Sequence, residues 1–333
     1  YLGTSDMTPE ELKSEFYRLA CTFYVSPGNE RTYVVLSGLN ENMPAAVQLF
    51  EKLLADAQVN KEAYTNMTSD ILKARSDAKL NQGQNFSRLM SFAMYGPKSP
   101  ATNLLTEAEL TNMNPQELVD RIHNQNSYKH RILYYGPSSS KDLLATINQY
   151  HQVPAALKDI PAGNEYSYLE TPVTKVLVAP YDAKQIYMAQ ISNLDKKYDP
   201  AIEPIRALYD EYFGGGMNSI VFQEMRETRG LAYSAWASIM PPSYLKYPYV
   251  LRTQIATQND KMIDAVTTFN DIINNMPESE AAFKLAKDGL TNRLRTERII
   301  KGDIIWSYIN AQDLGQNVDP RIKLYNDIQN MSL

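Results

Sequence analysis

Residues 225–237 (MRETRGLAYSAWA) carry two side chains, Arg226 and Tyr233, of the types that bind a polypeptide backbone. Both side chains donate hydrogen bonds, and an extended peptide offers carbonyl oxygens that accept them. Two donors on the carbonyl group beside a bond undergoing cleavage would position the substrate and stabilise developing negative charge. The alternative is a surface arginine and a half-buried strand tyrosine that share no role.

The elements around this pair determine whether the two side chains can meet. The apolar spacing of residues 218–228 (NSIVFQEMRET) predicts a helix that ends near Arg229 and Gly230. Aromatic residues in partial alternation then predict a strand over residues 231–239 (LAYSAWASI). Arg226 and Tyr233 would therefore converge at the junction, and an extended peptide could also pair with this strand.

Three consecutive glycines, Gly214, Gly215 and Gly216, lie between two predicted helices in the segment FGGGMNS. A helix N-terminus binds anions, but the sequence lacks the G-x-x-x-x-G-K-[ST] and G-x-G-x-x-G patterns of phosphate-binding loops. We favour a tight turn that uses the freedom of glycine to adopt a positive φ. A flexible loop beside a peptide-binding groove is the third interpretation.

The sequence gives little support for a metal site or for a catalytic nucleophile. Its three histidines are His123, His130 and His151, and they form neither H-E-x-x-H nor H-x-x-E-H. We therefore expect no metal bound by this chain and treat each histidine as an ordinary polar residue. No G-x-S-x-G motif occurs, and Cys21 lies in a predicted strand, where a buried, unreactive thiol is expected.

The composition limits the classes of partner. The chain has 333 residues, of which 44% are hydrophobic and 21% are charged, enough for two domains with separate cores. The formal net charge is -5 and no long basic block occurs, which argues against a nucleic-acid partner. No apolar run reaches the length of about eighteen residues that predicts a membrane span.

A repeat on the scale of a domain organises the chain. Thr8 and Glu11 form a predicted capping box at the start of a helix, with Pro9 at its first position. Two strands follow, and then two helices with Asn42 and Asn60 as predicted caps. The second half repeats this order of helix, strand, strand, helix and helix, over residues 218–228, 231–239, 247–257, 260–276 and 278–299.

The repeat predicts an α+β fold of two homologous domains, each a mostly antiparallel sheet with helices packed on one face. We assign the first domain to residues 1–151, a proline-containing linker to residues 152–172 and the second domain to residues 173–333.

Each half has elements for which the other half has no counterpart. Strands at 174–180 and 184–193 open only the second half, and a strand at 130–136 and a helix at 140–150 close only the first. We interpret the chain as two domains that are each truncated at one end, within a longer protein.

With the repeat in place, the motif R-x-x-x-G-x-x-Y at residues 226–233, opening a strand after a helix, resembles the pitrilysin-like zinc metallopeptidases. These include insulin-degrading enzyme and the mitochondrial processing peptidase. The opening YLGTSDMTPEELKSEF also resembles the segment that follows the zinc-binding helix in those enzymes. The resemblance covers essentially the whole chain.

The resemblance implies that this chain is the zinc-free, substrate-binding half of a metallopeptidase acting on peptides or unfolded polypeptides. Arg226 and Tyr233 would contact the substrate, and zinc would be held by a partner half or subunit. The chain alone would be inactive, since residues 206–210 (RALYD) replace the zinc motif.

Two alternatives stay open. A zinc motif could lie upstream of Tyr1, with Glu62, Asp70 or Asp77 as further ligands. Alternatively, the chain could be a non-catalytic scaffold or assembly subunit with the same fold.

Overall fold

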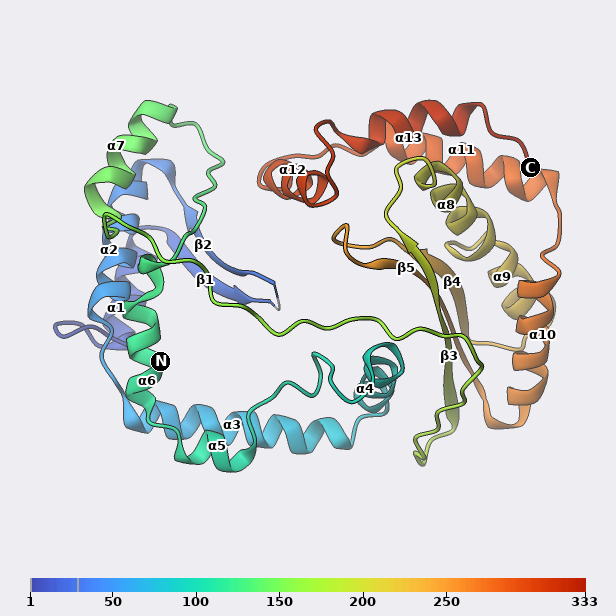
Figure 1. Cartoon of the computed structure of the whole chain (residues 1–333), viewed down its shortest axis with the longest axis horizontal. Coiled ribbons are helices and arrows are strands. Elements are labelled where there is room, and N and C mark those ends of the chain that lie inside the picture. The colour runs from blue at the N-terminus through green and yellow to red at the C-terminus, as the bar shows by residue number, and fades with distance from the viewer. Residues whose placement is uncertain (1, 29) are drawn as a thin grey trace. The chain divides into compact units, whose positions relative to one another are not determined.

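The computed structural model describes residues 2–28 and 30–333, and its helices and strands are labelled in Figure 1. The chain forms two compact units that interleave along the sequence. The first unit runs to Leu80 and resumes over Asn103–Glu165, and the second comprises Asn81–Thr102 and Tyr166–Leu333. Both units combine helices with antiparallel strands, so the predicted α+β class is confirmed.

The first unit places its helices against a two-stranded sheet. The capping box at α1 is formed as predicted: Thr8 N donates to Glu11 Oε2 at 2.8 Å, and Glu11 N donates to Thr8 Oγ1 at 3.2 Å. The elements of this unit are α1 (Pro9–Arg18), β1 (Cys21–Pro27), β2 (Thr32–Gly38), η1 (Asn40–Asn42), α2 (Met43–Asp56), α3 (Lys61–Lys79), α5 (Glu107–Asn112), α6 (Pro115–His123), η2 (Gln125–Ser127) and α7 (Ser140–Tyr150).

The core of the first unit lies between its sheet and its helices. Phe16 of α1 and Phe23 of β1 have ring centroids 4.9 Å apart, and Phe23 and Phe50 of α2 are 5.3 Å apart. Cys21 is buried in this core, which confirms the predicted buried thiol. Asn42 stands at the N-cap position of α2, as predicted, but its side chain makes no capping hydrogen bond, and its Nδ2 donates to Leu19 O at 2.8 Å instead.

The second unit is built on a three-stranded antiparallel sheet of order β3-β5-β4. In Figure 1, α8, α9 and α10 gather on one side of this sheet and α4 lies on the other. The elements are α4 (Gln82–Tyr95), β3 (Gln185–Lys197), α8 (Glu203–Tyr209), η3 (Asp210–Gly214), α9 (Ile220–Phe222), η4 (Gln223–Thr228), β4 (Ser234–Met240), β5 (Pro248–Gln258), η5 (Asn259–Lys261), α10 (Met262–Asn274), α11 (Glu280–Thr296), α12 (Asp303–Asp313) and α13 (Pro320–Gln329).

The core of the second unit lies between the sheet and the helices α8, α9 and α10. Met225, Ile255 and Phe269 are fully buried there. Side chains alternate between the faces of a strand, so Arg252 and Gln254 of β5 point to the face that carries α4. Phe86 of α4 accordingly meets Tyr187 of β3, with ring centroids 5.6 Å apart.

The predicted repeat is visible in the order of elements. The first unit has α1, β1, β2, α2 and α3, and the second has η4, β4, β5, α10 and α11. Both strand pairs are antiparallel. In both units a short 3₁₀ turn, η1 or η5, leads from the second strand into the next helix.

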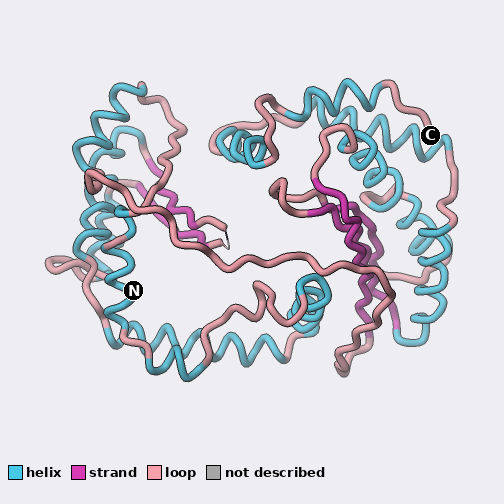
Figure 2. The backbone as a smooth tube through the Cα atoms, in the orientation of Figure 1, coloured by secondary structure: helices cyan, strands magenta, loops and turns pink. Residues whose placement is uncertain are grey.

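Two predicted strands do not form. Residues 130–136 (HRILYYG) and residues 174–180 (TKVLVAP) are irregular, and Val176 is 83% exposed. Their β-branched and aromatic composition favours a strand, but a strand needs a neighbouring strand, and no strand ladder forms along either stretch in the described residues. The second stretch belongs to the long irregular segment before β3 (Figure 2).

Candidate functional site

Arg226 and Tyr233 are brought together by the turn that joins η4 to β4. Gly230, at φ 56°, ends the helical segment in a left-handed conformation that suits glycine. The next two backbone amides, of Leu231 and Ala232, both donate to Met225 O, at 2.8 and 3.2 Å. Tyr233 N then donates to Ala256 O of β5 at 2.8 Å, which fixes the start of β4.

The guanidinium of Arg226 lies near two aromatic rings. Its Cζ is 5.1 Å from the ring centroid of Phe222, one helical turn earlier, and 5.9 Å from that of Tyr233. Cations within about 6 Å of an aromatic face are attracted by the ring quadrupole. Phe222 was not singled out from the sequence, although its spacing of four residues from Arg226 on a predicted helix places both side chains on one face.

The donors of both side chains are available to a ligand. Arg226 Nε is 3.7 Å from Glu227 Oε1, an ion pair between side chains about half exposed, which is weak in water. Tyr233 is 72% exposed. In the described part of the chain, neither the guanidinium nor the phenolic hydroxyl makes a side-chain hydrogen bond, so an incoming carbonyl would meet two free donors.

The structure explains the three consecutive glycines differently from the sequence-based prediction. They lie at the turn between η3 and α9, as predicted, but none of them has a positive φ, so the predicted reason for glycine there is wrong. Gly214 is needed for a close approach, since a Cβ there would lie 2.0 Å from Ala237 O and 2.5 Å from Ala237 N. Around Gly216, by contrast, no described atom lies within 4 Å of the corresponding position. Gly214 therefore lets η3 lie directly against β4.

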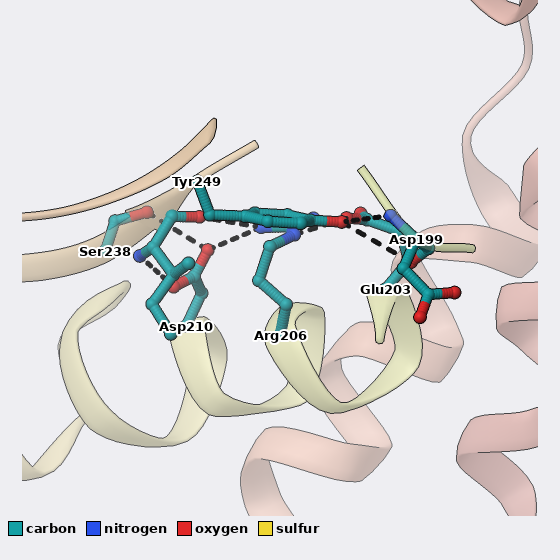
Figure 3. Close-up of polar contacts among 7 residues, drawn as sticks. Asp199, Glu203, Arg206, Asp210, Ser238 and Tyr249 are labelled. Atoms are coloured by element: carbon teal, nitrogen blue, oxygen red, sulfur yellow. Dashed lines mark hydrogen bonds and ion pairs between the residues drawn. The ribbon is translucent and has the colours of Figure 1, made fainter. Parts of the chain in front are cut away.

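Residues 206–210 (RALYD), at the position expected of a zinc motif, form an ion-pair network (Figure 3). Arg206 Nε donates to Glu203 Oε2 at 2.9 Å, and Arg206 Nη1 donates to Asp210 Oδ2 at 2.7 Å. Tyr249 OH donates to Glu203 Oε1 at 2.6 Å. A guanidinium with two carboxylate partners thus occupies this site, and the residues do not fit a zinc ion.

The same network covers the outer edge of β4. Ile239 N donates to Asp210 Oδ1 at 2.8 Å, and Ile239 O accepts from Arg206 Nη1 at 3.3 Å. Further along the edge, Gly214 lies against the backbone of Ala237. Both backbone groups of Ile239 are therefore already paired, and an added peptide strand cannot form a ladder along the whole of β4.

Burial dominates the protonation behaviour of this network. It raises the pKa of Asp210, against the opposing effects of the Ile239 N–H, Arg206 and Ser238 Oγ, which donates to Asp210 Oδ2 at 3.0 Å. Burial also raises the pKa of the Tyr249 hydroxyl, with the neighbouring Glu203 carboxylate adding to the shift. Tyr249 is therefore a neutral hydrogen-bond donor in this site.

The described residues contain no group of three or more histidine, cysteine, aspartate or glutamate side chains placed to hold a metal ion. Glu62, Asp70 and Asp77 all lie on α3 and form no such group. Across the same residues, each helix is too short or too polar to cross a membrane.

A family model for the peptidase M16 inactive domain matches residues 132–290, a segment that includes Arg226 and Tyr233. No curated protein matches the chain significantly. Solved structures also match the chain over nearly its whole length. The M16 inactive domain from Pseudomonas fluorescens is 16% identical, with a TM-score of 0.68, over 99% of this chain and 80% of that one.

Two other matching structures are of larger proteins. The periplasmic protease PqqL from Escherichia coli is 14% identical, with a TM-score of 0.71, over 99% of this chain. The ferredoxin protease FusC, solved as a mutant in complex with Arabidopsis ferredoxin, is 11% identical, with a TM-score of 0.65, over 98% of this chain. The chain spans 36% of PqqL and 37% of FusC.

The structural likeness shows the fold, and the family model shows the kind of domain. Together they confirm the resemblance to the pitrilysin-like metallopeptidases and to their zinc-free half. Residues 132–290 match the family model of the peptidase M16 inactive domain, and the whole chain has the fold of the solved M16 inactive domain from Pseudomonas fluorescens.

Proposed function

We propose that this chain is the substrate-binding, catalytically inactive half of a zinc metalloendopeptidase that degrades peptides or unfolded polypeptides. The observation that carries the proposal is the pair of unused hydrogen-bond donors on Arg226 and Tyr233, which lie side by side on an exposed face. The match to the inactive-domain family model supports a role in binding and not in bond cleavage.

In the proposed role, Arg226 and Tyr233 hold a substrate carbonyl through their side chains. The guanidinium and the phenolic hydroxyl donate to that oxygen, and they would stabilise negative charge as it develops there. The ring of Phe222, 5.1 Å from Arg226 Cζ, helps to keep the guanidinium in place. Because the outer edge of β4 is covered at Ala237 and Ile239, the substrate is held by side chains and not as a full added strand.

The catalytic zinc is expected in a partner half or partner subunit, because the described residues include no group of three or more side chains placed to hold a catalytic ion. FusC and PqqL are proteases in which this fold makes up about a third of the chain, which supports such an arrangement. The FusC structure contains a protein, ferredoxin, which supports a polypeptide substrate class for this chain.

The test is peptide hydrolysis by this chain together with its zinc-bearing half. We expect Arg226→Ala to lower kcat by roughly 10²–10³-fold, the effect of losing one donor to a developing oxyanion. Tyr233→Phe removes the hydroxyl alone and should also lower kcat. The matched control is Arg229→Ala, because Arg229 is equally exposed and already paired with Glu224, Nε to Oε2 at 3.4 Å.

A scaffold would behave differently. If Arg226→Ala and Arg229→Ala hydrolyse peptides equally well, the substrate-binding role is wrong and the assembly-subunit alternative takes its place. Circular dichroism of each variant would show that any loss of activity does not come from unfolding.

A further inference from the structure

Two of the three histidines of the chain meet in the first unit. His130 follows η2 and His151 caps the C-terminal end of α7, and they are 21 residues apart in sequence. Their Nε2 atoms are 2.8 Å apart, and the rings are nearly perpendicular, at 89°. Because the two residues come from different segments, the sequence spacing did not indicate this contact.

The other nitrogen of each ring fixes the tautomer. His130 Nδ1 lies 2.7 Å from Tyr128 O, and His151 Nδ1 lies 2.7 Å from Glu51 Oε1 on α2. Carbonyl and carboxylate oxygens only accept hydrogen bonds, so both Nδ1 atoms carry a proton. In neutral rings, both Nε2 lone pairs therefore point at each other. Asn126 Nδ2 donates to Glu51 Oε2 at 2.8 Å and steadies the carboxylate.

Two facing lone pairs need a positive centre between them, either a proton or a metal ion. Histidines that bind metals donate their second ring nitrogen to a carboxylate or a backbone carbonyl, and these two rings do so. Two nitrogens bound to one tetrahedral Zn²⁺ lie about 3.3 Å apart, which follows from Zn–N bonds of about 2.0–2.1 Å. Because the two Nε2 atoms face each other, the exposed ring of His130 would need to move back by about half an ångström and also tilt, so that both lone pairs reach an ion beside the line that joins the two atoms.

We propose that His130 and His151 form a two-imidazole site for a divalent transition-metal ion such as Zn²⁺, Ni²⁺ or Cu²⁺. Glu51 and the Tyr128 carbonyl orient the rings, and water completes the coordination. Ca²⁺ and Mg²⁺ are excluded by their preference for oxygen ligands. Within the described residues no third histidine, cysteine or carboxylate joins the pair as a ligand. The site is separate from the proposed peptidase role and would tie α7 to α2.

The charges around the pair permit such an ion. Glu51 supplies a negative charge next to His151, and both side chains are largely buried, at 15% and 12% exposure. Lys129, the residue before His130, forms an ion pair with Asp159, Nζ to Oδ1 at 2.5 Å. Lys158 Nζ lies over the Tyr128 ring, 5.9 Å from its centroid. The Glu51 carboxylate is thus a charged group in direct contact with the imidazole pair, through His151 Nδ1.

The chain offers a clean experiment because it has only three histidines. Titration of the full chain with ZnCl₂, followed by nitrogen-15 NMR of the imidazole rings, should shift the Nε2 signals of His130 and His151. The His123 signals should stay in place, since His123 Nε2 contacts Ala57 O, at 3.0 Å, elsewhere in the unit. Calorimetry should give one ion per chain.

Three variants and one control decide the assignment. His130→Ala and His151→Ala should each weaken Zn²⁺ binding at least tenfold, and Glu51→Gln should weaken it by about 10–100-fold as a positioning residue. His123→Ala should bind as the parent chain does. His130→Ala removes an exposed side chain, so it keeps the test valid even if His151→Ala disturbs folding.

Two results would overturn the proposal. One is an imidazole spectrum that responds to pH but to none of Zn²⁺, Ni²⁺ and Cu²⁺, which would leave a shared proton as the occupant. The other is binding that survives unchanged in His130→Ala.

Discussion

At the residue scale, Gly214 shows how one missing side chain sets the packing of a whole helix. A Cβ at this position would lie within 2.0–2.7 Å of three backbone atoms of Ala237. We expect Gly214→Ala to lower the free energy of unfolding of the second unit by at least about 1–3 kcal/mol, because the backbone of η3 would be forced from β4. Urea unfolding followed by tryptophan fluorescence would measure the change, since Trp236 lies in β4.

Gly216→Ala is the matched control for this prediction. No described atom lies within 4 Å of the new Cβ and φ is not positive, so this change should be neutral or slightly stabilising. Equal losses from both substitutions would mean that the glycine segment needs flexibility, which was the third interpretation of the sequence, and not close contact.

Phe222 and Arg226 form a second testable contact at this scale. A double-mutant cycle with Phe222→Leu and Arg226→Met should give a coupling energy of about 0.5–1 kcal/mol, the range of an exposed cation–π interaction. Chemical denaturation of the four proteins measures it without any substrate. A coupling near zero would show that the ring does not hold the guanidinium, whatever the role of Arg226 in binding.

Part of the site could be predicted from residue types, and part could not. Arg226 and Tyr233 could be recognised as a possible binding pair because both side chains donate hydrogen bonds and only a short turn separates them in sequence. The pairing of His130 with His151 depends on how α7 lies against α2, and no local pattern reports such a contact. The role of Gly214 depends in the same way on the neighbouring strand.

At the element scale, α8 and η3 are tied to β4 by Arg206 and Asp210. Arg206→Met should leave the buried Asp210 carboxylate without its cationic partner and cost about 3 kcal/mol at pH 7. Burial already raises the pKa of Asp210, and removal of Arg206, which lowers it, should raise that pKa further. A raised pKa means that the folded state favours the protonated, neutral carboxyl group. The free energy of unfolding lost in Arg206→Met should therefore be smallest at low pH and should grow as pH rises toward that pKa.

Denaturation at a series of pH values from 4 to 7 would compare the parent chain with Arg206→Met. The control is the double variant Arg206→Met/Asp210→Asn, in which the ionisable group is gone and the deficit should not change with pH. A deficit in Arg206→Met that is constant over this range would show that Asp210 is not the group responsible.

Sequence patterns predicted the elements that carry their own local signals. The capping box at Thr8 and the cap at Asn60, which accepts from Ala63 N at 2.9 Å, mark the starts of α1 and α3. Residues 130–136 and 174–180 were wrongly predicted as strands because a strand depends on a partner that composition does not reveal. The helices α12 and α13 were not predicted.

At the scale of the whole molecule, the two compact units do not follow the order of the chain. Residues 81–102 belong with the second unit, although they lie within the first domain as assigned from the sequence. Phe86 meets Tyr187, and Met90 Sδ accepts from Arg252 Nη2 at 3.4 Å, so α4 packs on residues more than a hundred positions later. The bounds 1–151 and 173–333 stay a prediction, and the behaviour of α4 can test them.

Two matched core substitutions make that test. Phe16 lies in the core of the first unit and Phe269 in that of the second, and each Phe→Ala change should cost about 3–5 kcal/mol. Hydrogen exchange should show that Phe269→Ala lowers protection in β5, α10 and also α4, while α3 is unaffected. Phe16→Ala should lower protection in β1 and α2 but not in α4. If α4 instead loses protection together with α3 in Phe16→Ala, the folding units follow the sequence-based bounds. If both variants lose protection equally in all of these helices and strands, the chain unfolds as one cooperative unit.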